Sequence, residues 1–147
     1  MIRVLVVDDH ELVRSGISRM LADNPDLDVI GQASSGEEAI EFVREDRPDI
    51  VLMDIRMPGI GGLEATRRIL RLDDSIRVIV VTACADDPYP SRVMQSGAQA
   101  YITKGADIQE MVRAIRKAHS GQRYISPEIA QKMALKQLAG EKDDDGE

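Results

Sequence analysis

Short apolar runs alternate with segments of helical periodicity through most of this 147-residue chain, and this alternation constrains the fold more than any other feature. Five strand-like runs stand at Ile2–Val7, Asp28–Ala33, Ile50–Met53, Arg77–Val81 and Ala100–Thr103. Between the runs, apolar residues recur at helical spacing, as Val13, Ile17 and Met20 do. Apolar strands separated by helices indicate a parallel sheet that is covered on both faces. Five β/α units in about 120 residues predict an α/β, flavodoxin-like, doubly wound sheet with strand order 2-1-3-4-5.

Capping residues support two of the predicted helices. Ser35 and Glu38 have the spacing of a capping box, in which two side chains satisfy free backbone N–H groups at the helix start. After the fifth β/α unit, Ser126 can cap a further helix, and Pro127 suits its first turn because no backbone donor is needed there. We expect this C-terminal helix to run to about Leu138.

The length suits one domain with a full hydrophobic core. We predict a globular domain over residues 1–121, a helical extension or linker over 122–139 and an acidic tail over 140–147. Residues 141–147 hold five acids and one lysine and no apolar side chain, so we expect this tail to be disordered.

Composition excludes several classes of protein. The net charge is −7 and no basic stripe is present, so these residues by themselves are a poor nucleic-acid binder. No apolar run approaches the ~20 residues that span a bilayer, and no signal peptide opens the chain. The single cysteine cannot form an internal disulfide and fits a reducing compartment. We therefore expect a cytoplasmic protein without membrane contact.

Polar residues follow four of the five strand-like runs. Asp8 and Asp9 follow the first, Asp54 the third, Thr82 the fourth and Lys104 the fifth. Right-handed crossovers bring these positions to one edge of a parallel sheet. Carboxylate oxygens suit Mg²⁺, and an aspartate can attack a phosphoryl group. A lysine and a hydroxyl group can then stabilise the charge on the transferring oxygens.

Each of these signals has an ordinary structural explanation. Asp8 and Asp9 could cap a helix, Asp54 could start the turn at Met-Pro-Gly, and Lys104 could be a solvated charge. Polar residues at four corresponding strand ends favour a phosphoryl site instead. His10 has no partner at metal-ligand spacing, so we expect it in the first turn of a helix near the acidic pocket rather than as a ligand.

The motifs VLVVDDHELVR, DIVLMDIRMPGIGGLEATRRI, VIVVTA and GAQAYITKGA resemble the receiver domain of bacterial two-component response regulators, which has a CheY-like fold. The resemblance covers residues 1 to about 121. DDPYPSRVMQSGAQAYITKGA, followed by GQRYISPEIAQKMA, resembles the GacA/UvrY branch of the NarL/FixJ group.

The resemblance implies a magnesium-dependent phosphoacceptor site. Asp54 would be the phosphorylated residue. Asp9, Asp54 and the backbone carbonyl of Arg56 would bind Mg²⁺ directly, and Asp8 would contribute partly through water. Arg56 and Cys84 would influence water access and hence the lifetime of the acyl phosphate. Cys84 could also be a redox sensor, although an incidental thiol is the simpler explanation.

The resemblance also implies a switch. Lys104 would contact the phosphoryl group, Thr82 would move to hydrogen-bond it, and Ala83 would leave room for it. Tyr101 would turn inward in the active state, although without the family it would be interpreted as an ordinary half-buried strand residue.

Two features depart from the family pattern. Gly105 follows Lys104 where many receivers have proline, so a cis peptide bond is less expected there. Pro88 and Pro90 stand where the fourth helix should begin, so we expect that helix to start late, near Pro90 or Ser91, and to be short.

The expected function is that of a phosphorylation-activated switch rather than an enzyme, catalysing only its own phosphorylation and slow dephosphorylation. A sensor histidine kinase or a histidine phosphotransfer domain would supply the phosphoryl group. We expect a weak homodimer that phosphorylation strengthens, and DNA binding only through a helix-turn-helix domain that these residues lack.

Two alternatives remain open. A single-domain receiver would pass on or store phosphoryl groups, or dock on a target protein. A haloacid-dehalogenase-type hydrolase would require Asp-x-Asp after the first strand, whereas this chain has Asp8-Asp9-His10. A nucleotide-binding fold is disfavoured because residues 59–62 lack the GxGxxG spacing.

Overall fold

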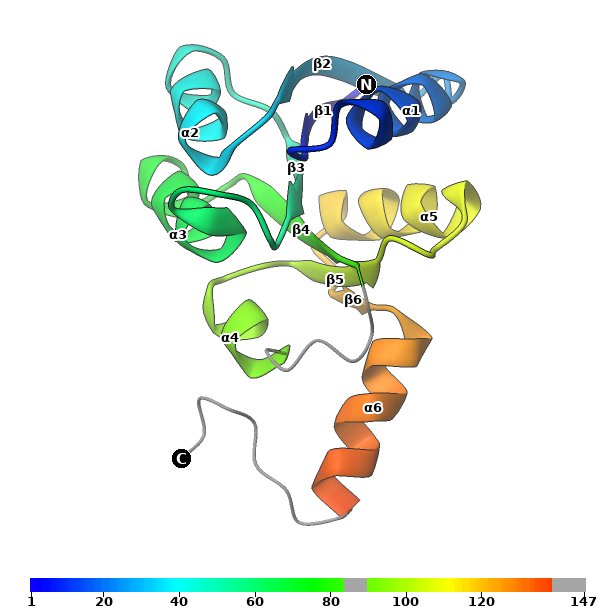
Figure 1. The fold of residues 1–147 in the computed structure, drawn as a ribbon. Helices are drawn as coiled ribbons and strands as arrows, with labels where there is room; N and C mark the ends of the chain where they lie inside the picture. The colour runs from blue at the N-terminus through cyan, green and yellow to red at the C-terminus, as the bar shows by residue number, and fades with distance from the viewer. Residues whose placement is uncertain (84–89, 139–147) are drawn as a thin grey trace.

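A computed structural model describes residues 1–83 and 90–138. Strands and helices alternate along the chain (Figure 1). The strands are β1 (Ile2–Val7), β2 (Leu27–Ala33), β3 (Ile50–Asp54), β4 (Arg77–Thr82), β5 (Ala100–Thr103) and β6 (Tyr124–Ile125). The helices are α1 (Glu11–Ala22), α2 (Gly36–Glu45), α3 (Gly61–Leu72), α4 (Pro90–Gln95), α5 (Ile108–His119) and α6 (Pro127–Leu138).

The strands form one parallel sheet in the order β2-β1-β3-β4-β5-β6. This order confirms the predicted doubly wound fold and adds one short strand at its edge. β6 pairs with β5 through Ala100 opposite Tyr124 and Tyr101 opposite Ile125. Tyr124 and Ile125 were not predicted as a strand, because two residues are too few to show a periodic pattern.

The sheet lies between two layers of helices, with α1 and α5 on one face and α2, α3 and α4 on the other (Figure 1). Alternate residues of β1 pack into the cores on opposite faces of the sheet. Val4 and Val6 belong to the core beneath α1 and α5, whereas Leu5 and Val7 belong to the opposite core. Burial on both faces explains why the strands read as continuous apolar runs rather than as alternating ones.

Hydrogen bonds at the helix starts agree with the sequence patterns. Ser35 caps α2 by accepting a hydrogen bond from the backbone N–H of Glu38. Asp107 caps α5 in the same way through Glu110. α4 has its first residue at Pro90, the late start expected from the prolines, and spans six residues.

α6 occupies the range predicted for the C-terminal helix, Pro127–Leu138. The acidic tail and Cys84 lie outside the described residues. The described part of the chain contains no cis peptide bond, so the Lys104–Gly105 bond is trans, as expected. Among these residues, none of the helices has both the length and the apolar character that crossing a bilayer requires.

The strand register aligns the carboxyl ends of the central strands. Val7 lies opposite Met53, so Asp8 and Asp54 follow at the same level. Thr82 lies opposite Thr103, which places Lys104 one residue beyond. The residues singled out at the strand ends therefore reach one edge of the sheet.

Candidate phosphoacceptor site

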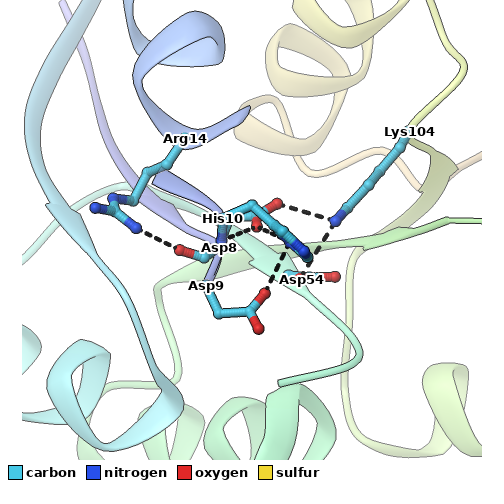
Figure 2. A network of polar contacts seen from close by, with 6 residues as sticks. All are labelled: Asp8, Asp9, His10, Arg14, Asp54 and Lys104. Carbon is cyan, nitrogen blue, oxygen red and sulfur yellow. Dashed lines mark hydrogen bonds and ion pairs between the residues drawn. The ribbon is translucent and has the colours of Figure 1, made fainter. Parts of the chain in front are cut away.

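Two buried carboxylates and one lysine form the centre of the site (Figure 2). Asp8 and Asp54 each have 3% of their surface exposed. The ammonium nitrogen of Lys104 lies 3.1 Å from Asp8 Oδ2 and 3.3 Å from Asp54 Oδ2. One cation therefore balances two buried anions, and the site retains an excess of negative charge.

Burial and the neighbouring charge of Asp8 raise the pKa of Asp54 from its ordinary value of 3.8 to about 6, although Lys104 and the backbone N–H of Arg56 oppose the rise. Burial lowers the pKa of Lys104. The hydrogen bond to Asp8 and the charges of both carboxylates outweigh this effect and leave the pKa of Lys104 above its usual value. Lys104 is therefore a stable cation beside a carboxylate that is costly to ionise.

Asp54 has one oxygen available for a further ligand. Within the described residues, its Oδ2 atom is buried and has no hydrogen-bond partner. Lys104 contacts this oxygen as an ion pair, but the contact does not have hydrogen-bond geometry. A buried carboxylate oxygen without a donor is unfavourable unless another group binds it.

His10 bridges the two acidic residues that precede it. Its Nδ1 atom lies 3.3 Å from Asp8 Oδ1 and 3.1 Å from Asp9 Oδ1 (Figure 2). It stands immediately before α1, where its backbone N–H donates to Asp8 Oδ1. The residue therefore lies next to the acidic pocket, as expected, and also contacts both carboxylates.

Arg14 holds the loop between β1 and α1 in place, a role that was not predicted from the sequence. Its guanidinium donates one hydrogen bond to the Asp8 carbonyl at 2.7 Å and another to the Gln32 side chain at 3.1 Å. No local pattern could reveal this role, because Arg14 lies in α1 and Gln32 lies in β2.

The loop after β3 packs tightly against Asp54. A Cβ atom on Gly62 would overlap the Asp54 carbonyl oxygen, so only glycine allows this close approach of α3. Glu37 of α2 accepts a hydrogen bond from the backbone N–H of Ile60 at 3.3 Å and thereby fixes the loop from outside. Glu37 was also missed, since it lies 23 residues from its partner.

The remaining predicted site residues differ in how exposed their side chains are. Thr82 is buried, and its carbonyl accepts a hydrogen bond from the Lys104 backbone N–H at 2.7 Å. Ala83, which follows Thr82, and Arg56, two residues after Asp54, are both exposed. Tyr101 is 1% exposed and belongs to the hydrophobic core rather than to the half-buried surface. The inward turn of Tyr101 in the active state stays a prediction.

A comparison with protein families gives a match over residues 4–116 to the response regulator receiver domain. The chain belongs to this family. Because the match includes all the strand ends described above, it favours the receiver interpretation over the hydrolase alternative. Receiver domains of response regulators are typically phosphoacceptor switches, and response regulators of this kind interact with histidine kinases and form dimers.

Individual relatives place this receiver domain within a branch of the family. It is 60% identical over 144 residues to response regulator GacA of Pseudomonas aeruginosa, with 98% of this chain and 67% of that protein covered. It is 54% identical over 142 residues to response regulator UvrY of Escherichia coli, with 97% and 65% covered. The chain thus spans about two thirds of the length of these curated relatives.

A solved structure agrees with the fold. A two-component response regulator of the LuxR family from Aurantimonas sp. SI85-9A1 is 38% identical and superimposes with a TM-score of 0.87, with 92% of this chain and 97% of that chain covered. The GacA/UvrY branch predicted from the sequence motifs is confirmed by the identities to GacA and UvrY.

The receiver's acidic residues fit a hard divalent cation. Asp8, Asp9, His10 and Asp54 each offer one ligand atom, and these atoms all lie within 4.8 Å of one another. Three of them are carboxylate oxygens, the ligand type that Mg²⁺ prefers. Receiver domains generally bind Mg²⁺ at an acidic pocket of this kind.

Proposed function

We propose that this receiver domain accepts a phosphoryl group on Asp54 from a phosphohistidine of a sensor kinase or phosphotransfer protein. The observation that carries the proposal is the buried Asp54 carboxylate at the sheet edge, whose Oδ2 atom receives no hydrogen bond from the described residues and lies 3.3 Å from the ammonium of Lys104. An aspartate used only for structure would have its oxygens satisfied by hydrogen bonds.

The reaction is a phosphoryl exchange between two side chains. A carboxylate oxygen of ionised Asp54 forms a bond to phosphorus while the bond between phosphorus and the histidine nitrogen breaks. The electron pair of that bond stays on the nitrogen, which can then take up a proton. Lys104, already close to Asp54, stabilises negative charge on the phosphoryl oxygens, and the Thr82 hydroxyl is the expected further donor.

Asp8, Asp9, Asp54 and the Arg56 carbonyl would hold the magnesium ion. When bound, Mg²⁺ neutralises charge on the transferring oxygens and on the acidic pocket. The carboxylates of Asp8 and Asp54 are the strongest support for this assignment, since their mutual repulsion contributes to the raised pKa of Asp54. Lys104 alone offsets only part of that repulsion.

The output of the switch would lie in the full-length protein. We propose that phosphorylation of Asp54 changes dimerisation and thereby controls a C-terminal helix-turn-helix domain that binds DNA, as in the NarL/FixJ group that the sequence resembles. The GacA and UvrY relatives, which are longer than this chain, support a further domain in such proteins. The cytoplasmic location expected from the sequence stays a prediction.

The site and metal assignments are tested by intact-mass measurement after incubation with acetyl phosphate. We expect one phosphoryl group per chain in the presence of Mg²⁺ and none with a chelator. Asp54→Asn should abolish labelling and Asp9→Asn should reduce it strongly, whereas the exposed Asp74→Asn serves as a control that labels normally. Full labelling of Asp54→Asn would overturn the proposed site, and full labelling in chelator would overturn the role of the metal.

A further inference from the structure

β6 and the start of α6 attach directly to the strand that leads into the phosphoacceptor site (Figure 1). This segment lies beyond residues 4–116, where the family match ends. The backbone N–H of Ser126 donates to the Tyr101 carbonyl at 2.9 Å. Ile129 of α6 is 2% exposed and shares a core cluster with Tyr101. Both the backbone and the side chain of Tyr101 thus adjoin the extension.

The hydroxyl group of Ser126 joins three elements. It accepts a hydrogen bond from the Thr103 backbone N–H of β5 and donates one to Glu110 Oε2 of α5, each at 3.3 Å. Glu110 Oε2 also accepts a bond of 2.6 Å from the Tyr124 hydroxyl of β6. Ser126 is 1% exposed, so water does not readily replace these bonds. The short Tyr124 bond anchors the cluster, and the two long bonds of Ser126 are its weakest connections.

Thr103 is adjacent to Lys104, whose ammonium contacts Asp54. The backbone N–H of Lys104 bonds to the Thr82 carbonyl, and its ammonium contacts Asp8 and Asp54. Because Lys104 Nζ lies 3.3 Å from Asp54 Oδ2, a phosphoryl group on Asp54 would place its oxygens against this ammonium. Phosphorylation would therefore give Lys104 a new anionic partner directly at the end of β5.

We infer that Ser126 is a positioning residue that couples Lys104 to α6. Through Thr103 and Glu110, its hydroxyl holds the end of β5 and the start of α6 in the arrangement that opposes phosphorylation. Phosphorylation of Asp54 shifts Lys104, breaks the long Ser126 bonds and loosens α6 from the sheet. This inference rests on the proposed phosphorylation of Asp54 and names the route by which that event reaches the extension.

The coupling free energy between two sites is the same in both directions, so the coupling can be measured from either site. If phosphorylation loosens α6, then weakening the attachment of α6 must favour phosphorylation. A merely structural hydroxyl would instead leave the affinity for a phosphoryl mimic unchanged. The direction of the affinity change therefore distinguishes coupling from simple support of the fold.

The test compares Ser126→Ala with the wild-type chain, using beryllofluoride and Mg²⁺ as the phosphoryl mimic. The affinity is measured by titration, and the attachment of α6 by hydrogen exchange of its backbone amides, with and without the mimic. Ser120→Ala is the matched control, because Ser120 is an exposed serine at the end of α5 whose hydroxyl donates to the nearby Lys117 carbonyl. Glu110→Gln provides a second variant on another element, and Ser126→Thr tests rescue by a retained hydroxyl.

We expect Ser126→Ala to bind beryllofluoride about fivefold more tightly than wild type, at the lower end of typical allosteric coupling. Its α6 amides should exchange faster without the mimic and should respond less when the mimic is added. Glu110→Gln should shift both quantities in the same direction, Ser126→Thr should return toward wild type, and Ser120→Ala should change neither. Unchanged or weaker binding in both Ser126→Ala and Glu110→Gln would overturn the inference. Failure of the wild-type chain to bind the mimic would instead overturn the proposed function.

Discussion

Asp54 is the residue at which folding and function conflict most. Its carboxylate is buried, and its pKa rises to about 6 from 3.8 because burial and Asp8 disfavour the charged form. A raised pKa means that the folded state binds the proton more strongly than the unfolded chain. This contribution to stability is fully present below about pH 4 and is lost as the pH rises through about 6. The contribution of Asp54 to stability is thus absent where Asp54 is ionised and able to act as a nucleophile.

Asp54→Asn should therefore stabilise the fold at high pH. At pH 8 we expect the free energy of unfolding of the variant to exceed that of wild type by about 2 kcal/mol, because the buried charge is gone. At pH 4 the difference should largely disappear. Urea unfolding at both pH values measures this, with the exposed Asp74→Asn as a control. A variant that is no more stable than wild type at pH 8 would contradict the electrostatic explanation.

At the scale of elements, the approach of α3 to β3 depends on Gly62. Because a Cβ atom there would overlap the Asp54 carbonyl oxygen, the start of α3 must move if alanine is introduced. Gly16 in α1 offers a matched contrast, since a Cβ atom at that position meets nothing within 4 Å. The two glycines therefore separate steric effects from the general effect of glycine on a helix.

We expect Gly62→Ala to destabilise the fold by about 2 kcal/mol through overpacking. Gly16→Ala should instead stabilise it by about 0.5–1 kcal/mol, because alanine favours a helix. Thermal or urea unfolding measures both values. The Gly62 variant should also label more slowly with acetyl phosphate, since Asp54 is displaced. Equal effects at the two positions would show that close packing at Gly62 is unimportant.

Local patterns predicted most of the elements, and their failures have physical reasons. The apolar runs revealed five strands because central parallel strands are buried on both faces. β6 escaped prediction, since its two residues depend on the hydrogen bonds offered by the edge of β5. The burial of Tyr101 was likewise missed, because Ile129 of α6 belongs to the same core.

In the phosphoacceptor site too, some residues could be predicted from the sequence and others depend on contacts between separate elements. Asp8, Asp54 and Lys104 could be found from the sequence, because their places follow from parallel topology and strand ends. The contacts of Arg14 with Asp8 and of Glu37 with Ile60 could not, since each depends on the relative placement of separate elements. Sequence periodicity carries no information on such side-chain contacts.

At the scale of the whole molecule, α1 carries apolar side chains that the fold leaves exposed. Leu12 is 88%, Met20 45% and Val13 38% exposed. With α5 they border an apolar groove of about 320 Å³ that also includes Gly16 and Met111. A continuous apolar surface of this kind supports contact with another protein. It complements the proposal that the chain works through a kinase and through association with a second copy.

We expect a weak dimer that the phosphoryl mimic strengthens, because phosphorylation is proposed to act through association. Sedimentation velocity over a range of concentrations, with and without beryllofluoride and Mg²⁺, measures this. The Asp54→Asn variant should show no response to the mimic and is the control. A monomer under all conditions would contradict the proposed dimerisation but not the phosphoacceptor site.

The central claim, that Asp54 carries the phosphoryl group, is tested most directly by locating the modification. An acyl phosphate is reduced by borohydride to an alcohol, which converts the modified aspartate to homoserine at its position in the chain. After labelling with acetyl phosphate and Mg²⁺, tandem mass spectrometry should find homoserine at position 54 and aspartate at positions 8 and 9. Homoserine at another aspartate, with none at position 54, would contradict the account.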